Sequence, residues 1–138
     1  MKKEFQSNGC SEIKLESTIQ NNFGFEQLYT EVYLGLNNGK KTSKAIFSTP
    51  EDLTDGSIPL TPAFQHHEGT LYLRHYLTYE AMPGGLDQAK TAAKKLQFHY
   101  TITNNCDAKT SNFKGFGLGP TFIESGSLVF FVTLIDIV

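Results

Sequence analysis

The stretch that decides the fold is SLVFFVTLIDI, residues 127–137 at the end of the chain. Its β-branched and aromatic residues are those that strands favour. Side chains alternate between the two faces of a strand, and here both faces are apolar: Leu128, Phe130, Val132 and Leu134 on one, and Val129, Phe131, Ile135 and Ile137 on the other. A strand that is apolar on both faces is typical of the interior of a layered β fold. We therefore expect apolar layers to cover both of its sides.

Alternation of apolar and polar residues predicts further strands upstream. The segments are Ile13–Ile19, Leu28–Leu36, Thr70–Glu80 and Leu96–Thr103. Asn37-Asn38-Gly39-Lys40 predicts a tight hairpin turn, because Asn and Gly tolerate positive φ, and a return strand should follow over residues 42–48. The prolines at positions 59 and 62 make residues 58–64 an edge or crossing segment, because proline cannot donate a ladder hydrogen bond.

One or two short helices are expected in connections. Thr49-Pro50-Glu51-Asp52 has a capping hydroxyl, a first-turn proline and acidic residues, so it predicts a helix that ends at Gly56. Pro83-Gly84-Gly85 predicts a turn, after which residues 86–95 are good helix formers. These ten residues could instead be a polar edge segment, because their apolar stripe is narrow.

These elements predict an all-β fold, an antiparallel β-sandwich or jelly roll of about six to eight strands, because strands recur without βαβ alternation. Residues 1–10 are expected to be a flexible N-terminal segment. Residues 11–138 are expected to form a single β-sandwich domain, since 138 residues suit one domain and eleven Phe can supply a core.

Charge and composition narrow the classes of partner. The net charge is −2, and Arg74 is the only arginine among twelve basic residues, which argues against a nucleic-acid partner. Since the sequence lacks an apolar run of about 18 residues, it predicts no membrane span. The basic start, Met1–Phe5, is not followed by an apolar stretch, so a soluble protein without a signal peptide in this chain is expected.

The two cysteines, Cys10 and Cys106, both lie in polar, turn-like segments. They could form a disulfide that closes a long loop, or they could be unrelated thiols. If they pair, an extracellular or particle-surface location follows, and otherwise a cytoplasmic one.

Histidines offer the nearest approach to a metal site. His66-His67-Glu68 is followed by His75 and, further on, by His99. Adjacent histidines on an extended chain point to opposite sides, so His66 and His67 are poorly placed to hold one ion, and His75 belongs to an apolar strand face. We expect neither a metal site nor a cofactor, and we identify no catalytic residues.

Two groups of residues are candidates for binding. Tyr72, Arg74 and Tyr76 share the polar face of their predicted strand, and Tyr29 and Tyr33 would join them if the faces align. Alternatively, these rings pack against a second sheet or a covering loop. The second group is Phe113 and Phe116, in a glycine-rich stretch (residues 113–120) that predicts a flexible loop able to contact a partner.

Two short resemblances carry limited information. Residues 128–137, with Phe116-Gly117 and Pro120 upstream, resemble the closing strand of FKBP-type prolyl isomerases, although that family's long helix and pocket tryptophan have no counterpart here. Residues 70–103 resemble the late strands of bacterial fimbrial subunits, whose paired cysteines lie closer together than Cys10 and Cys106. No functional residue is carried over from either family.

The function expected from these features is a non-enzymatic subunit that acts through its surface in structural assembly or adhesion. Its partner would be a protein or a second copy, and the alternating amino-terminal strand, Ile13–Ile19, could pair with a neighbouring subunit's sheet edge. The alternative is a small-ligand or carbohydrate-binding module whose partner is a glycan. An enzyme, such as a prolyl isomerase or hydrolase, is the third candidate.

Overall fold

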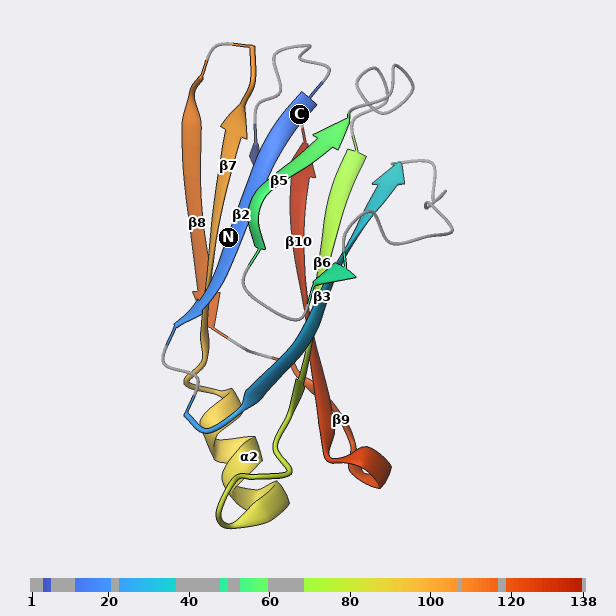
Figure 1. Ribbon diagram of the computed structural model, residues 1–138, viewed down its shortest axis with the longest axis vertical. Helices are drawn as coiled ribbons and strands as arrows, with labels where there is room; N and C mark the ends of the chain where they lie inside the picture. The colour runs from blue at the N-terminus through green and yellow to red at the C-terminus, as the bar shows by residue number, and fades with distance from the viewer. Residues whose placement is uncertain are drawn as a thin grey trace.

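The computed structural model describes residues 4–5, 12–20, 23–36, 48–49, 53–59, 69–106, 108–116 and 119–137, which form two facing β-sheets (Figure 1). The six-stranded sheet has the order β1 (Glu4–Phe5), β10 (Leu128–Ile137), β6 (Gly69–Thr78), β3 (Glu26–Leu36) and β4 (Ser48–Thr49), with β9 (Thr121–Ile123) also paired to β10. The four-stranded sheet has the order β5 (Leu53–Pro59), β2 (Glu12–Gln20), β7 (Gln97–Asn104) and β8 (Thr110–Phe116). Among the strands that the structure describes, β1 and β10 pair in parallel and the other pairs are antiparallel. The predicted all-β, sandwich-like fold is confirmed.

The core lies between the inner faces of the two sheets. Burial alternates along β6 and β7, as the period of a strand requires. The apolar side chains that fill this layer from the central strands are Ile13, Leu15, Val32, Leu71, Leu73, Leu77, Phe98, Ile102, Val129, Phe131 and Ile135. The rings of Phe98 and Phe131 meet across the gap with centroids 5.0 Å apart, so aromatic packing joins the sheets.

Helix α2 (Gly85–Ala93) closes one end of the sandwich and links β6 to β7 (Figure 1). It buries Ala89, Ala92 and Ala93, and this confirms the helical alternative for residues 86–95. Gly84 and Gly85 have φ of 87° and 60°, values that favour glycine, so the turn expected at Pro83 is present. A single 3-10 turn, η1 (Glu124–Gly126), precedes β10.

The helix predicted from Thr49 to Gly56 is wrong. Ser48–Thr49 form β4 against β3, and Leu53–Pro59 form β5, an edge strand that pairs with β2. The local capping signals were real, but pairing with β2 supplies backbone hydrogen bonds that a two-turn helix could not match. The prediction that Pro59 marks an edge is confirmed.

Two other expectations also change, and a third concerns residues that the structure does not describe. Within the glycine-rich stretch, residues 113–116 belong to strand β8 rather than to a loop, while residues 117 and 118 lie outside the described residues. In the N-terminal segment expected to be flexible, Glu4–Phe5 form β1 and Phe5 is buried. The hairpin turn at residues 37–40 and the return strand up to residue 47 lie outside the described residues.

β2 is an interior strand, between β5 and β7, and its Ile13 and Leu15 are fully buried. The hypothesis that the alternating amino-terminal strand, Ile13–Ile19, pairs with a neighbouring subunit's sheet edge is therefore wrong, because both edges of β2 already have partners within the chain.

Strand β10 differs from the prediction in the exposure of one of its two apolar faces. The face with Val129, Phe131, Ile135 and Ile137 is buried, as predicted. On the opposite face, Val132 is 45% exposed and Leu134 is 49% exposed. The expected second apolar layer over this strand is thus wrong: the sandwich covers one side of β10, and its other apolar side faces outward.

Candidate functional site

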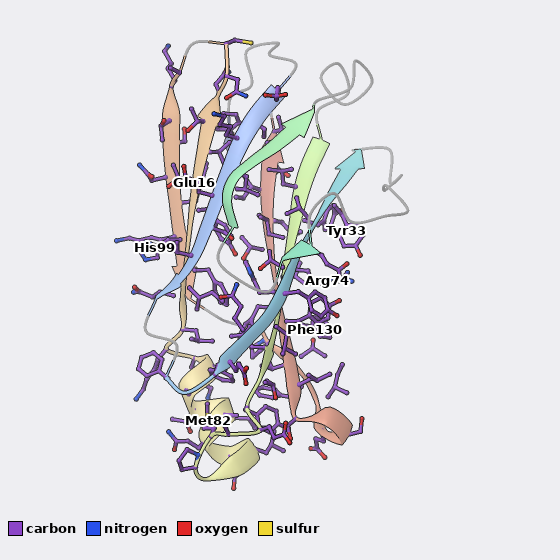
Figure 2. The ribbon with its side chains drawn as sticks, in the orientation of Figure 1. Glu16, Tyr33, Arg74, Met82, His99 and Phe130 are labelled. Carbon is purple, nitrogen blue, oxygen red and sulfur yellow. The ribbon has the colours of Figure 1, made fainter. Side chains whose placement is uncertain are left out.

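The outward side chains of β3, β6 and β10 form one continuous surface, which we call the aromatic face. Strand register sets its three rows: Tyr29, Tyr76 and Phe130; then Glu31, Arg74 and Val132; then Tyr33, Tyr72 and Leu134. Figure 2 shows Tyr33, Arg74 and Phe130 on this side of the molecule, away from Glu16 and His99 on the other sheet. The structure therefore brings Tyr29 and Tyr33 into line with the predicted Tyr72, Arg74 and Tyr76.

An aromatic row crosses the face at its first level. The rings of Tyr29 and Tyr76 stack with centroids 4.3 Å apart and planes 23° apart, and Phe130 lies 5.7 Å from Tyr76. Partial burial raises the pKa of Tyr29 above its ordinary value. Stacking holds the rings in place, so this part of the face presents a preformed apolar surface.

A cation and an anion occupy the middle row. The Arg74 guanidinium lies 5.4 Å from the centre of the Tyr33 ring and donates a 3.4 Å hydrogen bond from Nη1 to the Tyr76 hydroxyl. This hydrogen bond is the main reason that the pKa of Arg74 is raised above the ordinary value of an arginine. Glu31 accepts a hydrogen bond from the Tyr33 hydroxyl, which raises the pKa of that tyrosine. Arg74 Nε is buried without a hydrogen-bond partner, so this N–H is not accessible to an acceptor outside the chain.

The third row depends on a glycine. Tyr72 lies over Gly35 of β3, where a Cβ atom would overlap the tyrosine ring. Any larger residue at position 35 would push the ring off the sheet. The glycine thus keeps Tyr72 flat against β3, beside Leu134 of β10.

The second predicted group, Phe113 and Phe116, is not part of this face. Both belong to β8 in the other sheet. The Phe113 side chain is half-buried against the core, and it lines a shallow hollow of about 350 Å³ together with His99, Tyr100, Thr101, Asn112 and Lys114. The Phe116 side chain lies outside the described residues.

The sequence singles out His66, His67, Glu68, His75 and His99 as the nearest approach to a metal site. His66, His67 and Glu68 lie outside the described residues. Across the described ranges, no three His, Cys, Asp or Glu side chains converge as metal ligands. His75 points into the core instead, where it is 1% exposed.

His75 belongs to a buried chain of hydrogen bonds between the sheets. Thr30 Oγ1 lies 3.0 Å from His75 Nδ1, His75 Nε2 lies 2.7 Å from the Tyr100 hydroxyl, and that hydroxyl donates to Thr133 Oγ1 at 2.9 Å. Because Tyr100 gives its proton to Thr133, Nε2 of His75 must donate to Tyr100, and Nδ1 accepts from Thr30. Burial lowers the pKa of His75 to about 3, so the ring is neutral and structural.

Sequence reasoning assigned Phe130, Val132 and Leu134 to one face of their strand but missed them as part of the site. The signal was present, because a strand with two apolar faces and one covering layer must expose the second face. The sequence does not show whether one or two layers of the fold cover this strand.

No family model, curated protein or solved structure matches this chain. Among the described residues, no helix is long and apolar enough to cross a membrane.

Proposed function

We propose that this chain is a non-enzymatic β-sandwich subunit that acts through protein–protein contacts in structural assembly or adhesion, with the aromatic face as its contact surface. The single observation that carries the proposal is the exposure of Val132 and Leu134 beside the aromatic row. Contiguous exposed apolar surface is costly in water, and such patches commonly mark interaction sites.

The composition of the face supports a protein partner. Tyrosine, phenylalanine and arginine are enriched in the cores of protein interfaces, and tyrosine and arginine are the commonest energetic anchors. The face has four tyrosines, Phe130 and the chain's only arginine. Its rings are already ordered by stacking, so binding would lose little side-chain entropy.

A carbohydrate is the alternative ligand for the same face, since tyrosine rings beside Arg74 and Glu31 offer both stacking surfaces and polar groups. Sugars stack on the open face of an aromatic ring. Tyr29 and Tyr76 instead cover one another at 4.3 Å, which leaves fewer ring faces for a sugar. This geometry favours the protein partner, and a glycan array that gave signals lost in Tyr76→Ala would reverse the preference.

Site-specific photo-crosslinking tests the proposed contact surface. A benzophenone amino acid at position 132 should form a covalent adduct with a protein in the cells that make the chain. The same probe at Glu16, an exposed position on the outer face of the other sheet, is the matched control and should form much less adduct. Equal labelling at the two positions, or no adduct at position 132, would overturn the proposal.

A further inference from the structure

The middle row of the aromatic face has opposite charges on adjacent strands. Glu31 of β3 and Arg74 of β6 are direct cross-strand neighbours in the sheet register. Both charged groups are held by tyrosines, Arg74 by Tyr33 and Tyr76, and Glu31 by Tyr33. The centre of the face is therefore one anion beside one cation, both ordered, with apolar residues around them.

This arrangement is complementary to itself. Consider a second copy that packs face to face, related by a two-fold axis that runs parallel to the strands between β3 and β6. The rotation places β3 of one copy over β6 of the other and keeps each row level. Glu31 then faces Arg74 of the second copy, and Arg74 faces Glu31 of the second copy, so two equivalent ion pairs form.

The same rotation matches the neighbouring rows. Tyr29 faces Tyr76 of the second copy, and Tyr33 faces Tyr72 of the second copy, so aromatic side chains meet above and below the charges. Sheets that pack face to face lie roughly 10 Å apart, a gap that large side chains such as tyrosine and arginine can fill. A two-fold axis along β6 itself would instead place Arg74 against Arg74, which is repulsive.

We propose that the occupant of the aromatic face is a second copy of this chain, in a symmetric dimer with reciprocal Glu31–Arg74 pairs. This inference rests on the proposed function, because it names the partner of the same surface. Homo-oligomers with two-fold symmetry are the commonest soluble assemblies, and their interfaces must be self-complementary in this way. Here the middle row of the aromatic face supplies both the anion, Glu31, and the cation, Arg74.

Charge reversal tests the proposal by sedimentation equilibrium. The wild-type chain should dimerise, and Arg74→Glu or Glu31→Arg should each weaken the dimer at least tenfold, because each places like charges in opposition across the interface. An equimolar mixture of the two single variants should form heterodimers about as tight as the wild-type dimer, since one copy then has two anions and the other two cations. The double variant Glu31→Arg/Arg74→Glu should also dimerise.

The mixing experiment separates a contact between copies from an effect within one copy. Each single variant also places like charges side by side within its own sheet, so circular dichroism must show that it is folded. If either fails to fold, Arg74→Gln and Glu31→Gln remove a charge without creating repulsion, and each should weaken the wild-type dimer. A monomeric wild type, unchanged dimers in the single variants, or a monomeric mixture would overturn the proposal.

Different experimental results would reject the contact surface and the symmetric dimer. A crosslinked adduct at position 132 with a different protein, together with a monomeric wild type, would reject the second copy but keep the aromatic face as a contact surface. The absence of any adduct at that position would reject the contact surface itself.

Discussion

The imidazole of His75 is an ionisable group placed where its charged form cannot be solvated. It stacks 4.8 Å from Phe98 and bonds to Thr30 and Tyr100, whose phenol is itself kept protonated because burial raises its pKa. These contacts join β3 and β6 of one sheet to β7 of the other. The neutral ring is therefore part of what holds the sheets together.

The buried imidazole predicts acid sensitivity. In the unfolded chain the pKa of His75 is the ordinary 6.5, whereas in the fold it is about 3. Below pH 6.5, His75 binds a proton in the unfolded chain but stays neutral in the folded chain. The free energy of unfolding therefore falls as the pH drops from 6.5 toward 3. Between pH 7 and pH 5 this group should cost about 2 kcal/mol of unfolding free energy, measurable by urea denaturation.

Two variants check that His75 is the cause. His75→Phe should be less stable at pH 7, because Thr30 and Tyr100 each lose a hydrogen bond, but it should lose less stability between pH 7 and pH 5 than the wild type. Thr133→Val removes the acceptor of the Tyr100 hydroxyl and should cost about 1 kcal/mol at both pH values. If His75→Phe had the same pH dependence as the wild type, the imidazole would not be the titrating group.

At the scale of an element, β10 contacts β6 along its whole length and packs only one of its two apolar faces against the core. Val129 points inward and is fully buried, while Val132 points outward beside Arg74. The two residues are of the same type on the same strand. They form a matched pair for measuring what each face contributes.

Val129→Ala should lower the unfolding free energy by about 2 kcal/mol, through lost burial and the cavity that remains. Val132→Ala should change it by less than about 0.5 kcal/mol, because that side chain is already partly in water. Urea unfolding at a dilution where the protein is monomeric gives both values. Equal losses would mean that the outer face is covered within the single chain.

At the scale of the whole molecule, the two cysteines bear on how the N-terminal segment is tied to the sandwich. Cys106 lies just after β7, and its backbone N–H donates to the Asn104 side chain at 2.8 Å. No free thiol occurs among the described residues, and Cys10, the other cysteine of the chain, lies outside them. The pairing of Cys10 with Cys106 stays a prediction.

Mass spectrometry after alkylation tests this pairing. The oxidised chain should take up no alkyl group until it is reduced, and then two. A Cys10→Ser/Cys106→Ser variant should be less stable by about 4 kcal/mol if the bond restrains the unfolded chain over a loop of this size. Two alkyl groups without reductant would show that the thiols are separate.

Much of the strand pattern could be predicted because alternation is a local property. Period-two patterns located β2, β3, β6, β7 and β10, and the same period placed Tyr72, Arg74 and Tyr76 on one face. Whether Tyr29 and Tyr33 join them depends on the register between β3 and β6, which is a pairing of segments some forty residues apart. No local pattern contains that information.

Local patterns in the sequence therefore predict that the chain forms strands, which residues share a strand face, and that residues 86–95 could form a helix. Leu53–Pro59 is a strand because it pairs with the edge of β2, and this contact between distant segments exists only in the folded chain. The tertiary structure also decided that one face of β10 meets the core and the other meets water, because burial depends on how many layers assemble around a strand. The sequence pattern predicts which residues of the aromatic face share a strand face, but their exposure depends on how the two sheets assemble.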